Sequence, residues 1–83
     1  MKALPILDER ATGIDVGSES LHVSIGGGAP KVTGTMTSEV QALVAWLVQQ
    51  GVRSVALEAT GVYWLYLYEA LEAAGIEVLV VNG

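Results

Sequence analysis

The 83 residues include no cysteine, which excludes a disulfide framework and a thiolate metal site within them. Only four residues are basic against nine acidic, and the net charge is -5. A nucleic-acid-binding surface normally carries clustered lysine and arginine, so the composition argues against this chain supplying one by itself. If this chain does bind nucleic acid, the positive charge that neutralises the phosphates must come from bound metal or from other protein.

Long apolar runs are also absent, and no stretch approaches the roughly 20 residues that cross a bilayer. The segment from Met1 to Asp8 is too short and too soon charged for a signal peptide. We therefore expect no membrane partner and a cytoplasmic location. Apolar side chains are nevertheless abundant, at 52% of the sequence, and the mean hydropathy is +0.51. These values favour one small domain that is buried on many sides, or a part of something larger.

Alternation of apolar and polar side chains predicts three strands in the first part of the chain. Residues 1–10 are expected to form a polar lead-in that need not be ordered. The strands are predicted at 11–17, 21–26 and 31–36, with a glycine-rich turn before the third. Short connections between them favour an antiparallel meander.

The pattern then changes to a helical period. Thr37 or Ser38 is the expected N-cap, and Ser38 stands at capping-box spacing from Gln41. Apolar side chains recur every three or four residues up to Gln50, and Gly51 is expected to end the helix. A second helix of the same pattern is predicted between Thr60, as its cap, and Gly75. Strands are predicted at 54–58 and 77–82, the last apolar on both faces like a covered parallel strand.

The resulting order is βββαβαβ, an α/β arrangement. Right-handed crossovers place both helices on one face of a mixed five-stranded sheet with strand order 3-2-1-4-5. This is the ribonuclease-H-like arrangement. These residues provide no cover for the other sheet face, which we expect to be exposed or paired with another copy.

Two carboxylates stand out within this pattern. Asp15 lies in an apolar strand between Gly13 and Gly17, and Glu58 ends a second apolar strand, close before Gly61. On adjacent strands about 4.8 Å apart, both could reach one cation if they point the same way. Hard oxygen ligands suit Mg²⁺ or Mn²⁺. Periodicity alone leaves the alternative open, in which Asp15 forms a turn and Glu58 is a solvated strand-end acid.

Other polar and aromatic residues have weaker claims to a site. His22 is expected to be a surface or edge histidine rather than a metal ligand. Trp46 and Trp64 stand among apolar helix positions, which predicts core packing. Glu19 follows the first strand and could approach the acid pair, but no spacing argument supports it.

Three segments carry a family resemblance: GIDVG at 13–17, VALEATGVYW at 55–64 and LEAAGIEVLVVN at 71–82. Together they closely resemble the DEDD-type transposases of insertion sequences. This family is related to the Piv DNA invertase, and some of its members are bridge-RNA-guided recombinases. The resemblance extends over nearly the whole chain from Ala11 onward, and its most specific motif is LEATG at 57–61, followed by Tyr63 and Trp64.

The resemblance implies that residues 11–83 are the first part of a RuvC-like catalytic domain whose four acids bind divalent metal. Asp15 matches the first acid and Glu58 the second, both as catalytic and metal-binding residues. The other two acids lie further along the family's chain, as does a domain with a serine implicated in strand exchange. Gly83 stands where the family continues with proline, so we expect a fold truncated at its C-terminus. The fragment by itself should be inactive.

The resemblance also implies partners and leaves rivals. The full-length protein would bind DNA and a guide RNA, and the uncovered sheet face favours a homo-oligomer. One rival is a fragment of the actin-like and sugar-kinase ATPases, although Glu19 would repel the phosphate that their loop binds. The other is a non-catalytic interaction module in which the acids are relics.

Overall fold

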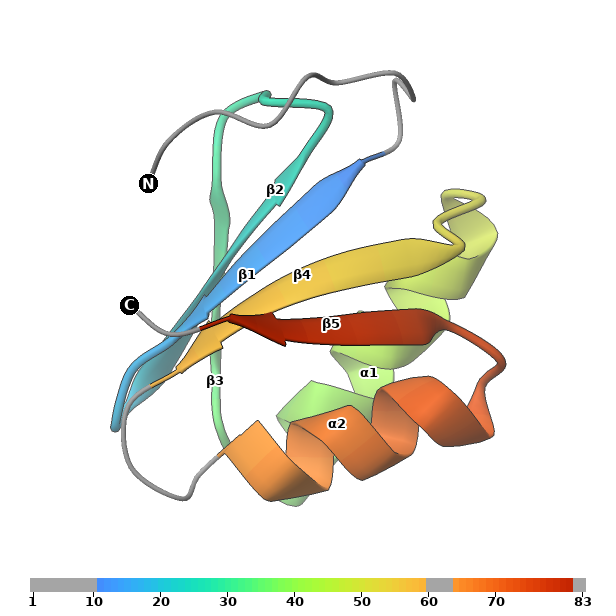
Figure 1. Ribbon diagram of the computed structural model, residues 1–83. Helices are drawn as coiled ribbons and strands as arrows, with labels where there is room; N and C mark the ends of the chain where they lie inside the picture. Colours follow the sequence, from blue (N-terminus) through green and yellow to red (C-terminus); the bar gives the residue numbers. More distant parts are fainter. Residues whose placement is uncertain (1–10, 60–63, 82–83) are drawn as a thin grey trace.

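The computed structural model describes residues 11–59 and 64–81. In these ranges the chain forms five strands and two helices in the predicted order βββαβαβ (Figure 1). The elements are β1 (Thr12–Val16), β2 (Ser20–Ile25), β3 (Lys31–Gly34), α1 (Thr37–Gln49), β4 (Ser54–Ala59), α2 (Trp64–Ala73) and β5 (Glu77–Val81).

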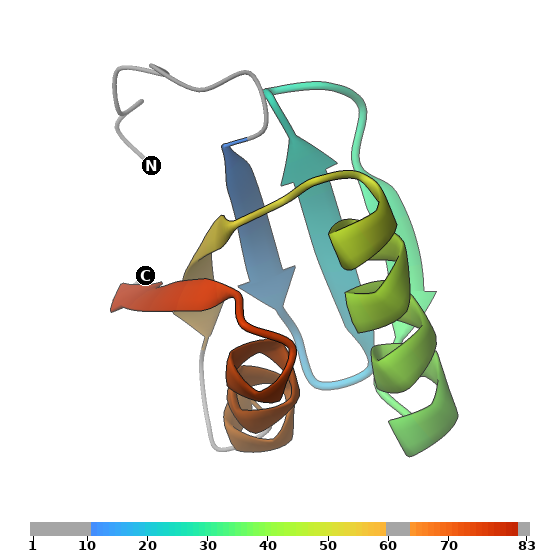
Figure 2. The ribbon, with the colours of Figure 1, turned by 90° about the vertical axis from the view of Figure 1, so that its right-hand side faces the viewer.

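The strands form one mixed sheet in the order β3-β2-β1-β4-β5, as predicted. The meander β1, β2 and β3 is antiparallel, whereas β4 pairs in parallel with both β1 and β5. Both helices lie on the same side of this sheet, as Figures 1 and 2 show together. The strand order and the single helical layer confirm the ribonuclease-H-like fold.

The core lies between the sheet and the two helices. Strand alternation sends Ile14 and Val16 toward the helices, and the same period sends Leu57 of β4 to that side. Leu47 of α1 and Leu71 of α2 meet them, and all five side chains are buried. Burying one such side chain stabilises the fold by about 1.5–3 kcal/mol, so this layer holds the sheet in place.

Both helices end in the same Schellman motif, as the glycine positions predict. After α1, Gly51 adopts φ of 77° and its N–H donates to the Val48 carbonyl, while the Val52 N–H donates to Leu47. After α2, Gly75 adopts φ of 83° and its N–H donates to the Glu72 carbonyl, while the Ile76 N–H donates to the Leu71 carbonyl. The residues that follow the glycines are buried, so each cap also anchors the next strand to the core.

The start of α1 differs from the sequence prediction. Met36 is the N-cap, rather than Thr37 or Ser38, and its backbone N–H donates to Oε1 of Glu39 at 3.2 Å. The third helical residue therefore supplies the capping carboxylate, and the predicted partner Gln41 instead bonds Tyr66. Because the chain must already turn at Met36, β3 ends at Gly34 and is shorter than predicted.

The last strand is also more open than its sequence suggests. β5 forms an edge of the sheet, and Leu79 and Val80 are 59% and 40% exposed. The expectation of a strand covered on both faces is therefore wrong for the part of the chain that the structure describes. The predicted cap Thr60, the glycine Gly61, residue Asn82 and the lead-in 1–10 lie outside the described residues, so the division between lead-in and domain stays a prediction.

Candidate active site

The acid pair lies on the sheet face opposite the helices. In β1 the buried residues alternate with Gly13 and Asp15, and in β4 they alternate with Ala56 and Glu58. Side chains in a strand point alternately to the two faces, so these four residues share the face that no described helix covers. We call this face, which carries Gly13, Asp15, Ala56 and Glu58, the open face.

Strand register brings the two acids together. Asp15 and Glu58 are direct partners in the parallel pairing of β1 with β4. Adjacent strands are about 4.8 Å apart, and the two side chains stand on the same face. The backbone geometry therefore meets the condition that the two acids lie on adjacent strands and point the same way.

His22 occupies the other side of Asp15. It is the direct partner of Asp15 in the antiparallel pairing of β1 with β2, and it is exposed, as predicted. The row across the open face thus reads His22, Asp15, Glu58, with one titratable side chain from each of three adjacent strands. From the sequence, His22 is expected to be a surface or edge histidine, without a neighbour being assigned to it. Counting back from the short turn between β1 and β2 would have found this position, since the hairpin fixes the register.

A shallow pocket of about 250 Å³ surrounds this row. Gly13 forms part of it, and a Cβ added there would meet no atom within 4 Å, so the space beside the acids is open. Gly17, on the other side of Asp15, does not have such open space. A Cβ at Gly17 would approach the Ser20 carbonyl at 3.2 Å, and the Gly17 N–H donates to that oxygen, so this glycine serves the turn.

No positive charge neutralises the acids within the described ranges. The basic residues there are Lys31 and Arg53. The Lys31 ammonium lies 4.7 Å from the centre of the Trp46 ring, on the helix side of the sheet. Asp15 and Glu58 therefore keep oxygen donors on the open face, but the described residues contain no group of three or more potential metal ligands. The pair fits a hard divalent cation in donor type and still needs further ligands.

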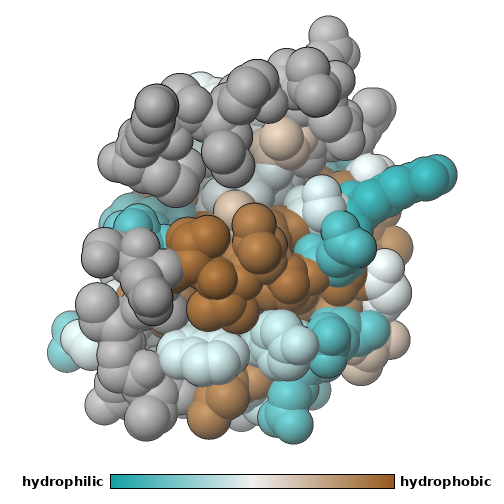
Figure 3. All heavy atoms as spheres, in the orientation of Figure 1, coloured by the Kyte–Doolittle hydropathy of each residue, from teal (hydrophilic) through white to brown (hydrophobic). Residues whose placement is uncertain are grey.

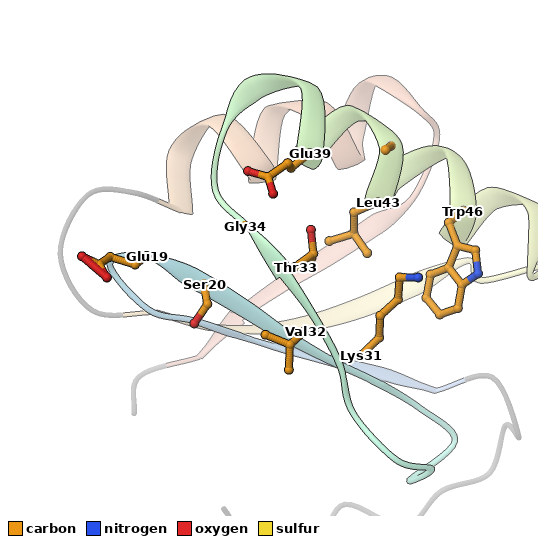
Figure 4. Close-up of a pocket in the computed structure, with 10 residues that line it drawn as sticks. Glu19, Ser20, Lys31, Val32, Thr33, Gly34, Glu39, Leu43 and Trp46 are labelled. Carbon is orange, nitrogen blue, oxygen red and sulfur yellow. The ribbon is translucent and has the colours of Figure 1, made fainter.

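Glu19 does not join the acid pair. It lies in the turn between β1 and β2 and lines a different cavity of about 630 Å³, bordered by β3 and α1 (Figure 4). That cavity also contains Glu39, Lys31 and Trp46. Trp46 and Trp64 pack against the core, as predicted.

The fold and the acids together define a class: a ribonuclease-H-like domain with two strand-borne carboxylates side by side on its open face. A family model described as transposase, that of the DEDD transposases of the IS110 type, matches residues 12–83. The chain belongs to this transposase family, which confirms the resemblance seen in its motifs. No curated protein matches the chain. Neither described helix is long and apolar enough to cross a membrane.

Proposed function

We propose that this chain forms the part of a DNA transposase's catalytic domain in which Asp15 and Glu58 hold Mg²⁺ or Mn²⁺. The reaction served is the cleavage and rejoining of DNA. The observation that carries the proposal is the direct pairing of these two acids across β1 and β4 on one face. Family membership favours this function over the ATPase alternative.

The chain's own residues support this role in three ways. Rigid strands fix the spacing of the two carboxylates, and carboxylate oxygen is the donor that Mg²⁺ and Mn²⁺ prefer. Gly13 and Ala56 keep the adjacent surface low, so a bulky phosphodiester could approach the open face. A divalent cation bound there would stabilise negative charge on the attacking and leaving oxygens of the phosphodiester.

Two carboxylates make an incomplete site. Nuclease sites with two metal ions use more ligands than this pair, so we expect the remaining acids to come from polypeptide beyond these 83 residues. DNA is the partner that family membership implies. A guide RNA, self-association and a cytoplasmic location remain predictions of the same proposal.

Titration with Mn²⁺ tests the metal role. His22 is the one histidine of the sequence and neighbours Asp15, so its imidazole signals report a paramagnetic ion bound by the acid pair. Paramagnetic Mn²⁺ held by the pair should broaden the imidazole resonances in the NMR spectrum at high metal concentration. Asp15→Asn and Glu58→Gln should each remove the effect, whereas Glu69→Gln, an exposed acid on α2, should retain it. Equal broadening in all four proteins, or none in the wild type, contradicts the proposal.

A plasmid-nicking assay tests the incompleteness of the site. The 83-residue chain with Mn²⁺ should nick supercoiled DNA no faster than its Asp15→Asn variant, because two carboxylates do not complete the site. Nicking by the wild type that the variant lacks would show that the pair suffices.

If a partner nucleic acid binds equally well to an Asp15→Ala, Glu58→Ala double variant that also shows no metal effect, the interaction-module alternative gains support.

A further inference from the structure

The two edges of the sheet are built differently. At one edge, β3 has only four residues, follows Pro30 and begins with Lys31. Short length, proline and lysine are devices by which proteins prevent an edge strand from pairing with another chain. α1 also packs against β3. This edge is therefore protected.

The opposite edge lacks the proline and the lysine, although α2 packs against β5 as α1 packs against β3. β5 reads Glu-Val-Leu-Val-Val, without proline, lysine or glycine. Leu79 is 59% exposed on the open face, and Val80 is 40% exposed on the helix side. Figure 3 shows the apolar area that gathers over β5. An apolar, unprotected edge strand is a template for adding another strand.

One hydrogen bond identifies which residues of β5 direct their backbone N–H and C=O groups away from the sheet. The Glu77 N–H donates to the Arg53 carbonyl, so Glu77 directs its backbone toward β4. In a parallel pair the direction alternates along the strand, so Val78 and Val80 direct their N–H and C=O groups away from the sheet. β4 is the only neighbour of β5 among the described strands.

We propose that β5 pairs antiparallel with β5 of a second copy of this chain, with the two-fold axis at Leu79. In this register Val78 of each copy lies opposite Val80 of the other. Each such pair has outward-facing groups on both strands and exchanges two hydrogen bonds. Shifting the register by two residues leaves one of the valines without a valine partner. The strand is thus complementary to itself in one register.

Charge and closure favour a second copy over other strands. Glu77 is the one charged residue of β5, and this register places it opposite Val81 of the other copy rather than opposite its own equivalent. A two-fold interface uses each free edge once and closes. Pairing β5 with β3 of another copy would continue indefinitely, and Pro30 and Lys31 oppose it.

The proposed dimer does not depend on the metal role of the acids. It joins two five-stranded sheets into one continuous sheet whose open faces point the same way, since Leu79 meets Leu79 on that face. Glu58 is level with Val81, so Glu58 of one copy would lie three strand spacings across and four residues along the sheet from Glu58 of the other, which is about 20 Å. Two acid pairs would then face one side of the assembly.

Sedimentation of two matched variants tests the proposal. Leu79 and Val32 are both 59% exposed on the open face but lie at opposite edges. Leu79→Lys should raise the dimer dissociation constant at least about tenfold, because pairing would bring two lysines together on the axis. Val32→Lys should leave it unchanged. A monomeric wild type at high concentration, or equal effects of both variants, overturns the proposal, and the second result indicates stacking of open faces instead.

Hydrogen exchange of the wild-type protein gives a second readout, which does not depend on whether the variants fold. In the wild-type dimer the Val78 and Val80 amides should be protected to the same degree as the Glu77 and Leu79 amides, which face β4. Dilution to monomer should release Val78 and Val80 alone. Because each copy carries a net charge of -5, added salt should strengthen the dimer. Fast exchange of Val78 and Val80 in a wild-type dimer overturns the proposal.

Discussion

The two faces of the sheet come from the same strands but carry different kinds of side chain. Ile14 and Leu57 point to the helices and are buried, whereas their chain neighbours Asp15 and Glu58 point to the open face. The two-residue period of each strand thus places core-forming side chains on one face and the two proposed metal ligands on the other. Packing of the covered face against the helices fixes the strand register, and that register places the two acids side by side on the open face.

The strongest test of this separation compares two adjacent residues. Leu57 is fully buried, and Leu57→Ala should lower the free energy of unfolding by about 2–5 kcal/mol through lost burial and a cavity. Glu58→Gln should change it by no more than about 0.5 kcal/mol, because that side chain has no ion pair with any described residue to lose. Urea unfolding followed by circular dichroism measures both. Similar losses for the two variants would show that the faces are not separable.

A medium effect is expected at the helix ends. Gly51 adopts a positive φ, so Gly51→Ala should cost about 1 kcal/mol of unfolding free energy. Gly13, on the open face, has a negative φ and open space at its Cβ position. Gly13→Ala should therefore be neutral or stabilise the protein by up to about 0.5 kcal/mol. The same unfolding assay distinguishes them, and a costly Gly13→Ala would mean that something covers the open face.

The smallest expected effect is on the helix layer. The Tyr68 hydroxyl donates to Oε2 of Glu72 at 3.0 Å. This hydrogen bond, then the charge of Glu72 and then burial raise the pKa of Tyr68 above its usual value of 10.0. Since the folded-state pKa is the higher one, the stabilisation is present below the unfolded pKa and is lost as pH rises through the folded value.

Glu72→Gln should move the pKa of Tyr68 back toward its usual value, as measured by NMR titration of the ring resonances. Glu69→Gln is the control, because Glu69 is exposed on the same helix and makes no bond to Tyr68. An unchanged titration of Tyr68 in Glu72→Gln would show that the bond does not form in solution.

Much of the fold could be predicted because its signals are local and periodic. Alternation identified the strands, the helical spacing identified α1 and α2, and crossover handedness then fixed the sheet order. The start of α1 could not be predicted, because Thr37 and Ser38 are good capping residues and only the conformation shows that Glu39 caps Met36 instead. The openness of β5 depends on what packs around it, which its composition does not reveal.

Only part of the candidate site could be predicted from the sequence. The neighbouring positions of Asp15 and Glu58 follow from two strands of known order and similar start, so counting along each strand was enough. The position of His22 required the hairpin register, and the separation of Glu19 from the acids required the direction of the turn. Neither depends on residue type, so composition and motif alone miss them.

The central claim is that Asp15 and Glu58 serve one cation, and a double-variant cycle of Mn²⁺ affinity tests it most directly. Calorimetry on the wild type, Asp15→Asn, Glu58→Gln and the double variant gives the coupling between the two positions. We predict weak binding by the wild type and the same loss in each single variant as in the double variant. Wild-type affinity in either single variant, or losses that simply add, would contradict a shared cation.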